Sequence, residues 1–132
     1  VEVFGWQVKG PSGIDDSFIA QMRFQEDVYA QFDCSFVVPY HTFMEVIGDE
    51  ATLIIPMPFT PMSKEFLFLT RGDKTEKITV KAPGLYHGEV EDMADAILLG
   101  KPPRISLADT RANTRAILAL YESAKSGKPV SL

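Results

Sequence analysis

The C-terminal third of the chain carries the clearest hydrophobic pattern. After Tyr86, apolar residues recur every three or four positions, which is typical of a helix with one buried face. These residues are Val90, Met93, Ala94, Ile97 and Leu98. Acidic residues fill the first turns, where they complement the helix dipole, and Gly100 is followed by two prolines that prevent continuation. The pattern predicts a helix that ends at Gly100.

A second helix is predicted between Ser106 and Gly127. Ser106 and Asp109 form an imperfect capping box at its start, and Gly127 with Pro129 marks its end. One side of this helix is apolar, through Ala112, Ala116, Ile117, Leu120 and Ala124. Both helices are therefore expected to cover an apolar surface.

Alternating apolar and polar residues before Tyr86 predict β-strands. Residues 17–36 alternate on both sides of a polar turn at 25–27, the pattern of an antiparallel hairpin with one apolar and one mixed face. Cys34 falls on the apolar face and reads as a core residue, not as a nucleophile. Further strands are expected at 2–9, 42–47, 51–55, 64–71 and 76–82.

Strands followed by two helices indicate an α+β fold. We expect a single domain over residues 1–132, with a predominantly antiparallel, open-faced sheet and both C-terminal helices packed on one face. The other face is neither clearly polar nor clearly buried. The hairpin contributes Ile19 and Tyr29 to it, and the 64–71 strand is apolar on both sides.

Composition and charge exclude several classes of protein. With 45% hydrophobic and 23% charged residues, the 132-residue chain is ordinary for a soluble globular domain. Its longest apolar run, 53–59, is interrupted by prolines and is too short to cross a membrane. The net charge of −5 disfavours nucleic-acid binding. The single cysteine cannot form an internal disulfide, which favours the cytoplasm.

The same C-terminal third resembles the end of the Gfo/Idh/MocA oxidoreductases. The resemblance lies in the segment Tyr86-x-x-Glu89-Val90-Glu91-Asp92-Met93-Ala94-Asp95-Ala96-Ile97, in Gly100-Lys101-Pro102-Pro103, and in the run from Ala119 to Val130. Upstream segments resemble the family's sheet strands. In the family, the open sheet face packs against another subunit, so the resemblance implies a homo-oligomer formed through that face.

Other motifs of the family are absent from this sequence. There is no Gly-x-Gly-x-x-Gly, since Gly5, Gly10 and Gly13 have the wrong spacing. The Glu-Lys-Pro motif and the Asp-x-x-x-His segment are also missing, and Lys101-Pro102 matches another part of the family. The resemblance therefore implies an excised or cleaved C-terminal domain, inactive alone. The catalytic residues and an NAD- or NADP-binding Rossmann domain would lie outside this chain.

Tyr86 and His87 are the predicted substrate-binding residues. In the family, the aromatic residue that matches Tyr86 lies near the substrate pocket of many members, although a buried or capping tyrosine is an equal alternative. His87 can assist a hydroxyl substrate, yet it matches no fixed family residue, and a surface histidine four positions before Glu91 is the commoner outcome. No catalytic or cofactor-binding residue is predicted in this chain.

Several other polar residues have ordinary structural readings. The acidic residues around His87 are an unsuitable metal set, because neighbouring helical side chains diverge. His41 reads as an edge residue, and Asp15 and Asp16 as turn residues. Two arginines, Arg111 and Arg115, lie on one helix side and can receive an anion, although a solvated face is the simpler reading.

Two classes of function remain. The first is the substrate-binding and oligomerising domain of an NAD(P)-dependent oxidoreductase that acts on a sugar or cyclitol-like alcohol. The second is a stand-alone interaction or ligand-binding module without catalysis. The open reading frame upstream of Val1 discriminates between them, because a dinucleotide-binding motif there supports the first.

Overall fold

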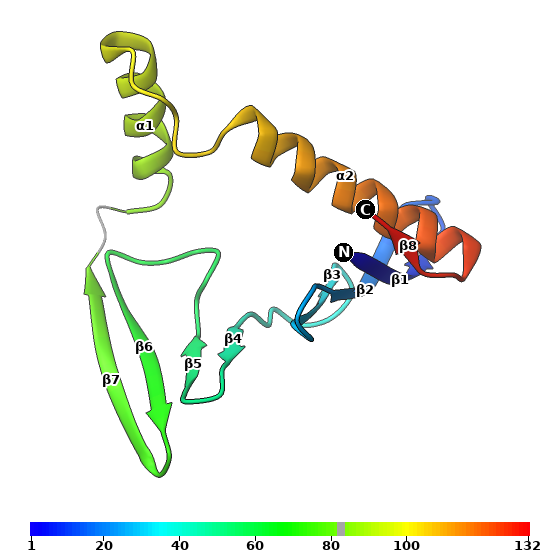
Figure 1. Ribbon diagram of the computed structural model, residues 1–132, viewed down its shortest axis with the longest axis horizontal. Coiled ribbons are helices and arrows are strands. Elements are labelled where there is room, and N and C mark those ends of the chain that lie inside the picture. The colour runs from blue at the N-terminus through cyan, green and yellow to red at the C-terminus, as the bar shows by residue number, and fades with distance from the viewer. Residues whose placement is uncertain (82–83) are drawn as a thin grey trace. The chain divides into compact units, whose positions relative to one another are not determined.

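The computed structural model describes residues 1–81 and 84–132 (Figure 1). Its elements are β1 (Glu2–Lys9), β2 (Asp15–Arg23), β3 (Tyr29–Ser35), β4 (Met44–Ile47), β5 (Thr52–Ile55), β6 (Lys64–Arg71), β7 (Lys74–Lys81), α1 (His87–Leu99), α2 (Leu107–Ser126) and β8 (Val130–Ser131). They form two compact units: Val1–Pro39 with Ile105–Leu132, and Tyr40–Arg104. Residue 82, the last of the predicted 76–82 strand, lies outside the described residues.

The predicted α+β class and the antiparallel strands are confirmed. The strands belong to two four-stranded sheets, one ordered β3-β2-β1-β8 in the first unit and one ordered β4-β5-β6-β7 in the second. Alternation along a strand tells which residues share a face, but not which strands are neighbours. The division into two sheets therefore could not be read from the pattern.

The core of the first unit lies between α2 and the first sheet. It consists of Val3, Phe18, Ala20, Ala119 and Leu120, with Met22, Ala124, Val130 and Leu132 packed at its edge. α2 packs directly against β1. The buried side of α2 is centred on residues 119, 120 and 123, so it is rotated from the predicted side, and Ala112 and Ile117 remain exposed.

Gly5 allows α2 and β1 to approach closely. A Cβ atom built on Gly5 would lie 2.8 Å from the carbonyl oxygen of Leu120 and 2.9 Å from Cζ of Phe18. At the same place, Ser123 accepts a hydrogen bond from the Gly5 N–H at 3.1 Å and donates one to the Lys128 carbonyl at 2.7 Å. A buried hydroxyl thus links the last helix to the first strand.

The turn between β2 and β3 has two residues with positive φ. Glu26 and Asp27 have φ angles of 58° and 57°, and the N–H of Val28 donates to the carbonyl of Gln25 at 3.4 Å. Positive φ at both central residues defines a type I′ turn, which matches the twist of the flanking strands. The predicted polar turn at 25–27 is confirmed.

Strand β3 is an exposed edge of the first sheet. Cys34 lies opposite Phe18 in the strand register, yet its side chain is exposed. The prediction of a core cysteine is therefore wrong. It fails because α2 covers β1, so β3 lies beyond the covered part of the sheet.

The face of the first sheet opposite α2 is apolar at its centre. The strand register pairs Trp6 with Ile19 on this face, and both are 50% exposed. The rings of Phe4 and Trp6 contact each other at a centroid distance of 4.3 Å, tilted by 58°. We call Phe4, Trp6 and Ile19 the open face.

The second sheet has one apolar and one mixed face. Its register aligns Val46, Leu53 and Leu69 on one face, and Ile54 and Phe68 on the other. On the mixed face, the Lys77 ammonium lies 3.6 Å from the centroid of the Phe66 ring.

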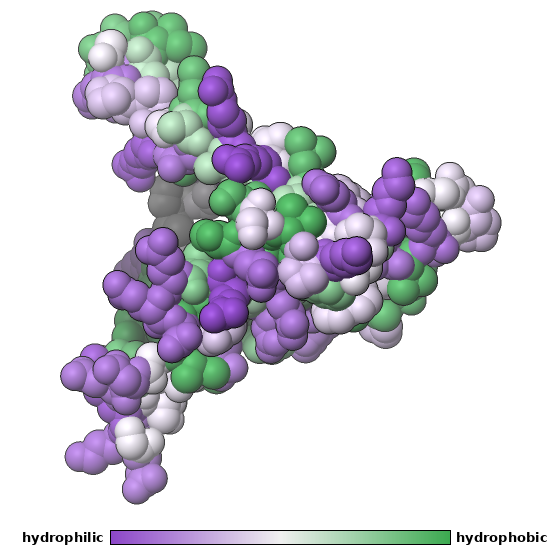
Figure 2. Space-filling model, turned by 45° about the vertical axis from the view of Figure 1, so that its right-hand side comes forward, coloured by the Kyte–Doolittle hydropathy of each residue, from purple (hydrophilic) through white to green (hydrophobic). Residues whose placement is uncertain are grey.

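Helix α1 begins and ends as predicted but buries none of its residues. Val90, Met93, Ile97 and Leu98 are all more than half exposed, and Figure 2 shows apolar surface on α1 at the top of the view. The prediction that α1 buries one face is therefore wrong for the described residues. The periodicity shows that the helix is amphipathic, but it does not supply the surface that would cover it.

Candidate functional site

Tyr86 immediately precedes α1 in an unusual backbone conformation. As the N-cap residue it has φ 63° and ψ −5°, and its side chain does not cap the helix. A left-handed conformation is uncommon for a bulky residue, and such conformations cluster at functional sites. The helix holds it in place through the Val90 N–H, which donates to the Tyr86 carbonyl at 3.2 Å.

The ring of Tyr86 is available for contact with another molecule. It is 67% exposed, and its hydroxyl has no hydrogen-bond partner among residues 1–81 and 84–132. Tyr86 therefore occupies the N-cap position, but its side chain is neither buried nor hydrogen-bonded to the helix. An exposed phenol can both donate and accept a hydrogen bond, which suits a hydroxyl-bearing ligand.

His87, the first residue of α1, contacts Glu91 on the helix surface. Its Nε2 lies 3.2 Å from Oε1 of Glu91, one turn later, and both side chains are exposed. This is the surface arrangement that the spacing indicates. The pair leaves Nδ1 as the ring atom that can face a ligand.

The acidic residues farther along α1 hold the loop that follows the helix. Asp92 accepts a hydrogen bond from the backbone N–H of Arg104 at 3.0 Å, and Asp95 pairs with Lys101 at 2.7 Å. Gly100, with φ 67°, donates its N–H to the Asp95 carbonyl. These contacts fix the 100–104 loop against α1, and no cluster suited to a metal ion occurs in the described part of the chain.

The other candidates do not join Tyr86 and His87. His41 precedes β4 and belongs to no strand, and its ring makes an edge contact with Phe43 at 5.4 Å. Asp15 is the first residue of β2 and not a turn residue. Its carboxylate accepts a hydrogen bond from the Tyr121 hydroxyl at 3.2 Å.

The pair of Tyr121 and Asp15 is absent from the sequence-based prediction. The two residues lie 106 positions apart, so no local spacing announces their contact. Partial burial raises the pKa of Tyr121 above its usual value, and the negative charge of Asp15 acts in the same direction. The Tyr121 ring also packs edge-on against Phe18 at 5.4 Å, which indicates a role in joining α2 to the sheet.

Gly10 and Gly13 do not lie in a dinucleotide-binding turn. Gly10 and Gly13 lie in the connection between β1 and β2, where the N–H of Gly13 donates to the Gly10 carbonyl at 3.0 Å. A pyrophosphate cradle needs a glycine-rich turn that leads from a strand into a helix. Here the turn leads into a second strand, so these residues do not fit NAD or NADP.

Comparisons with known proteins identify the family of this antiparallel α+β chain. The chain matches the oxidoreductase family's C-terminal alpha/beta domain over residues 3–132. It therefore belongs to the Gfo/Idh/MocA oxidoreductase family, as that family's C-terminal domain.

Solved structures share this fold. An aldose-aldose oxidoreductase from Caulobacter crescentus, complexed with glycerol, is 19% identical with a TM-score of 0.81, covering 100% of this chain and 41% of that one. A candidate oxidoreductase from Klebsiella pneumoniae is 16% identical with a TM-score of 0.78, covering 99% and 43%. A candidate NADPH-dependent oxidoreductase from Desulfitobacterium hafniense is 17% identical with a TM-score of 0.73, covering 98% and 41%. The chain thus spans less than half the length of these structures.

Neither helix has the character of a membrane span. Among the described residues, no helix combines the length and the apolar composition needed to cross a bilayer.

Proposed function

We propose that the chain is the substrate-binding and oligomerising domain of an NAD(P)-dependent oxidoreductase that acts on a sugar or cyclitol-like alcohol. The observation that carries the proposal is the family match over residues 3–132. The aldose-aldose oxidoreductase and its glycerol support a polyhydroxylated substrate, and the NADPH-dependent relative supports a nicotinamide cofactor. The single Cys34 favours a cytoplasmic protein.

In this proposal the chain's own residues bind and orient the substrate. The Tyr86 phenol and the free ring nitrogen of His87 contact substrate hydroxyls, because both are exposed and can donate or accept hydrogen bonds. The nicotinamide supplies the hydride acceptor or donor for the carbinol carbon. It is held by a Rossmann domain outside this chain, since the glycines of the first hairpin do not fit it.

Kinetics of the intact protein test the site. The gene region upstream of Val1 is read for Gly-x-Gly-x-x-Gly and Glu-Lys-Pro, and the encoded protein is assayed on aldoses and cyclitols with NAD and NADP. Tyr86→Phe should raise KM by about tenfold with a smaller change in kcat, because it removes one hydrogen bond to bound substrate. Tyr40→Phe, an exposed tyrosine outside the Tyr86–His87 site, is the matched control. An unchanged KM in Tyr86→Phe would refute the site, and an upstream region without either motif would refute the enzyme class.

The open face is the proposed oligomer interface. Trp6 and Ile19 are half exposed and adjacent, and apolar surface of this kind marks protein–protein contacts. Analytical ultracentrifugation at micromolar concentration should show a dimer or higher oligomer, and Ile19→Lys should convert it to monomer. Val28→Lys, in the β2–β3 turn, should leave the oligomer intact. A wild-type protein that sediments only as a monomer would rule out this interface.

A further inference from the structure

The hairpin of β6 and β7 gathers lysines on the mixed face of the second sheet. Its register places Lys64 directly opposite Lys81, and Lys77 opposite Phe68, two pairs farther along the same face. Because side chains alternate between the two faces of a strand, Lys64, Lys77 and Lys81 all project from this face. The whole hairpin belongs to the second unit, so its register alone brings the three lysines together. We call them the lysine cluster.

The ring of Phe66 holds two of these ammonium groups near each other. The Lys77 Nζ lies 3.6 Å from the ring centroid, and the Lys64 Nζ lies 5.7 Å from it. Each contact is a cation–π attraction, which limits the freedom of a long, flexible side chain. Thr79, opposite Phe66 on the same face, adds a hydroxyl that can donate a hydrogen bond. Ammonium groups that are already held in place lose less entropy when they bind an anion.

The lysine cluster carries positive charge without acidic neighbours on its face of the hairpin. Glu65 and Glu76, the glutamates of β6 and β7, alternate to the opposite face. Glu45 projects from the same face as the cluster, but it lies three strands from Lys77 in the register, roughly 14 Å away. Among the described residues, no ion pair involves a lysine of the cluster. Because opposed like charges destabilise a sheet, this part of the hairpin is stabilised when an anion binds.

We propose that the lysine cluster binds the phosphate group of a small soluble molecule. Lysine binds phosphate as a compact point charge, whereas the arginine fork matches planar carboxylates, and no arginine of β6 or β7 projects from this face. The phosphate oxygens contact the three ammonium groups and the Thr79 hydroxyl. Three positive charges suit a multivalent anion better than a singly charged one. The proposal does not depend on the substrate site before α1, because that site lies outside the hairpin.

Calorimetric titration of the 132-residue chain with three anions tests the proposal. Pyrophosphate carries two phosphoryl groups, inorganic phosphate carries one, and acetate is a singly charged carboxylate. Pyrophosphate should bind at least about tenfold more tightly than phosphate, because it reaches more of the ammonium groups, and acetate should show no binding. Equal affinity for acetate, or no pyrophosphate binding at millimolar concentration, would overturn the proposal.

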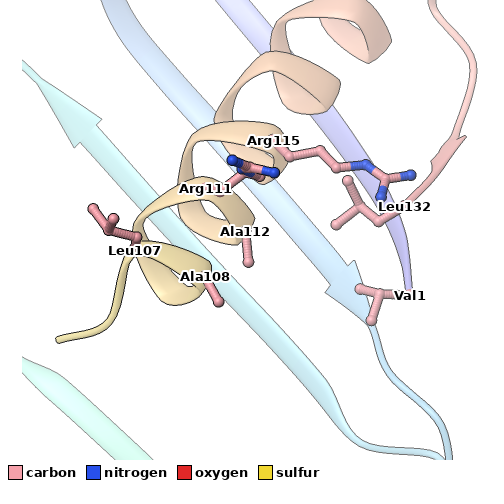
Figure 3. Close-up of a pocket in the computed structure, with 7 residues that line it drawn as sticks. All are labelled: Val1, Leu107, Ala108, Arg111, Ala112, Arg115 and Leu132. Carbon is pink, nitrogen blue, oxygen red and sulfur yellow. The ribbon is translucent and has the colours of Figure 1, made fainter.

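Nuclear magnetic resonance shows where pyrophosphate binds. Its addition should shift the backbone amide signals of residues 64, 77, 79 and 81. Arg111 and Arg115 form a second basic pair on α2, where they line a groove of the first unit (Figure 3). Shifts confined to residues 111–115 would place the anion there and would overturn the assignment to the hairpin.

Vesicles that contain phosphatidic acid separate a free phosphate from a lipid head group. The chain should not sediment with these vesicles, because its net charge of −5 is repelled by an anionic membrane. Co-sedimentation would assign this face to a lipid surface and would overturn the small-molecule ligand.

Variants separate the lysine cluster from the charge of the hairpin as a whole. The double variant Lys64→Gln/Lys81→Gln should weaken pyrophosphate binding by at least about tenfold, because it removes the opposed pair. Lys74→Gln is the matched control, since Lys74 lies on the same strand and alternates to the other face. Circular dichroism shows that each variant is folded, and the double variant should unfold at or above the wild-type temperature because the repulsion is relieved. Unchanged pyrophosphate affinity in the double variant would contradict the assignment.

Discussion

Replacing Ser123 by alanine removes one oxygen atom from the centre of the first unit. Ser123 is fully buried, and its hydroxyl bonds to the Gly5 N–H and to the Lys128 carbonyl. Strand β8 pairs with only Glu2 and Val3, so it does not reach Gly5. The Ser123 hydroxyl therefore takes the place of a neighbouring strand for this part of β1.

The expected loss of stability follows from the two backbone groups left without a partner. A buried polar group that loses its hydrogen bond costs about 1–3 kcal/mol. Alanine nearly preserves the volume of serine, so no cavity adds to this cost. For two groups with some relief by water, we expect Ser123→Ala to lower the free energy of unfolding by about 3 kcal/mol, a large share of the 5–15 kcal/mol typical of a domain.

The single tryptophan makes the measurement specific to this unit. Trp6 lies on β1, so its fluorescence during urea denaturation reports on the first sheet. With a typical slope of about 2 kcal/mol per molar urea, the midpoint should fall by roughly 1–2 M.

The control is Ser126→Ala on the same helix. The Ser126 hydroxyl makes only long hydrogen bonds of 3.3 Å near the helix end, where water can replace it. We expect this variant to lose less than about 1 kcal/mol. If Ser123→Ala unfolds within about 0.5 kcal/mol of the wild-type protein, the argument for the buried hydroxyl is refuted.

Four further predictions follow from other contacts. Gly5→Ala should lower the free energy of unfolding by about 1–3 kcal/mol, because its Cβ would meet the Leu120 carbonyl at 2.8 Å; an unchanged Trp6 transition would contradict this. The double variant Glu26→Asn/Asp27→Gly should raise the free energy of unfolding by about 1 kcal/mol, because asparagine and glycine tolerate the positive φ of a type I′ turn. A lower urea midpoint would count against that turn type. Cys34 should react with a thiol reagent in the folded protein as fast as in urea, and strong protection would contradict its exposure. The hydroxyl and backbone N–H of Ser106 hold the pKa of Asp109 below its usual 3.8. This N-cap therefore stabilises the fold above about pH 3.8, and the stabilisation is lost as pH falls through the lowered folded-state pKa. Ser106→Ala should raise the Asp109 pKa, measured by carbon-13 NMR titration. An identical Asp109 pKa in both proteins would exclude Ser106 as the cause of the shift.

Local features of the fold were predictable because their causes are local. Gly100 and Gly127 have the left-handed conformation expected after a helix, and Ser106 with Asp109 forms a complete capping box. Strand β6 has the predicted limits, since its pattern is bounded by turn residues. Each of these depends on residues within a few positions of one another.

Features that depend on distant contacts were not predictable. Because Ser123 is polar, the sequence pattern favours an exposed position for it. Its burial depends on hydrogen bonds to backbone groups 118 and 5 positions away. Cys34 follows the apolar alternation, yet only the placement of α2 decides which strands are covered.

The candidate site was predictable as a place on the chain but not as a conformation. The family resemblance directs attention to Tyr86 and His87, and helix spacing anticipates the contact of His87 with Glu91. The positive φ of Tyr86 has no sequence signal, because glycine or asparagine is the usual residue in that conformation.

The packing of residues 3–20 against residues 119–120 in one core has a consequence for synthesis on the ribosome. Val3, Phe18 and Ala20 leave the ribosome well before Ala119 and Leu120, which cover them, are translated. Until then the first three strands expose an apolar sheet with unpaired edges, a state prone to aggregation. Contacts of such large sequence separation also slow folding, because the intervening chain must close as a loop first. The growing chain thus depends on α2 for protection, and a nascent protein that stalls before α2 is a natural client for chaperones.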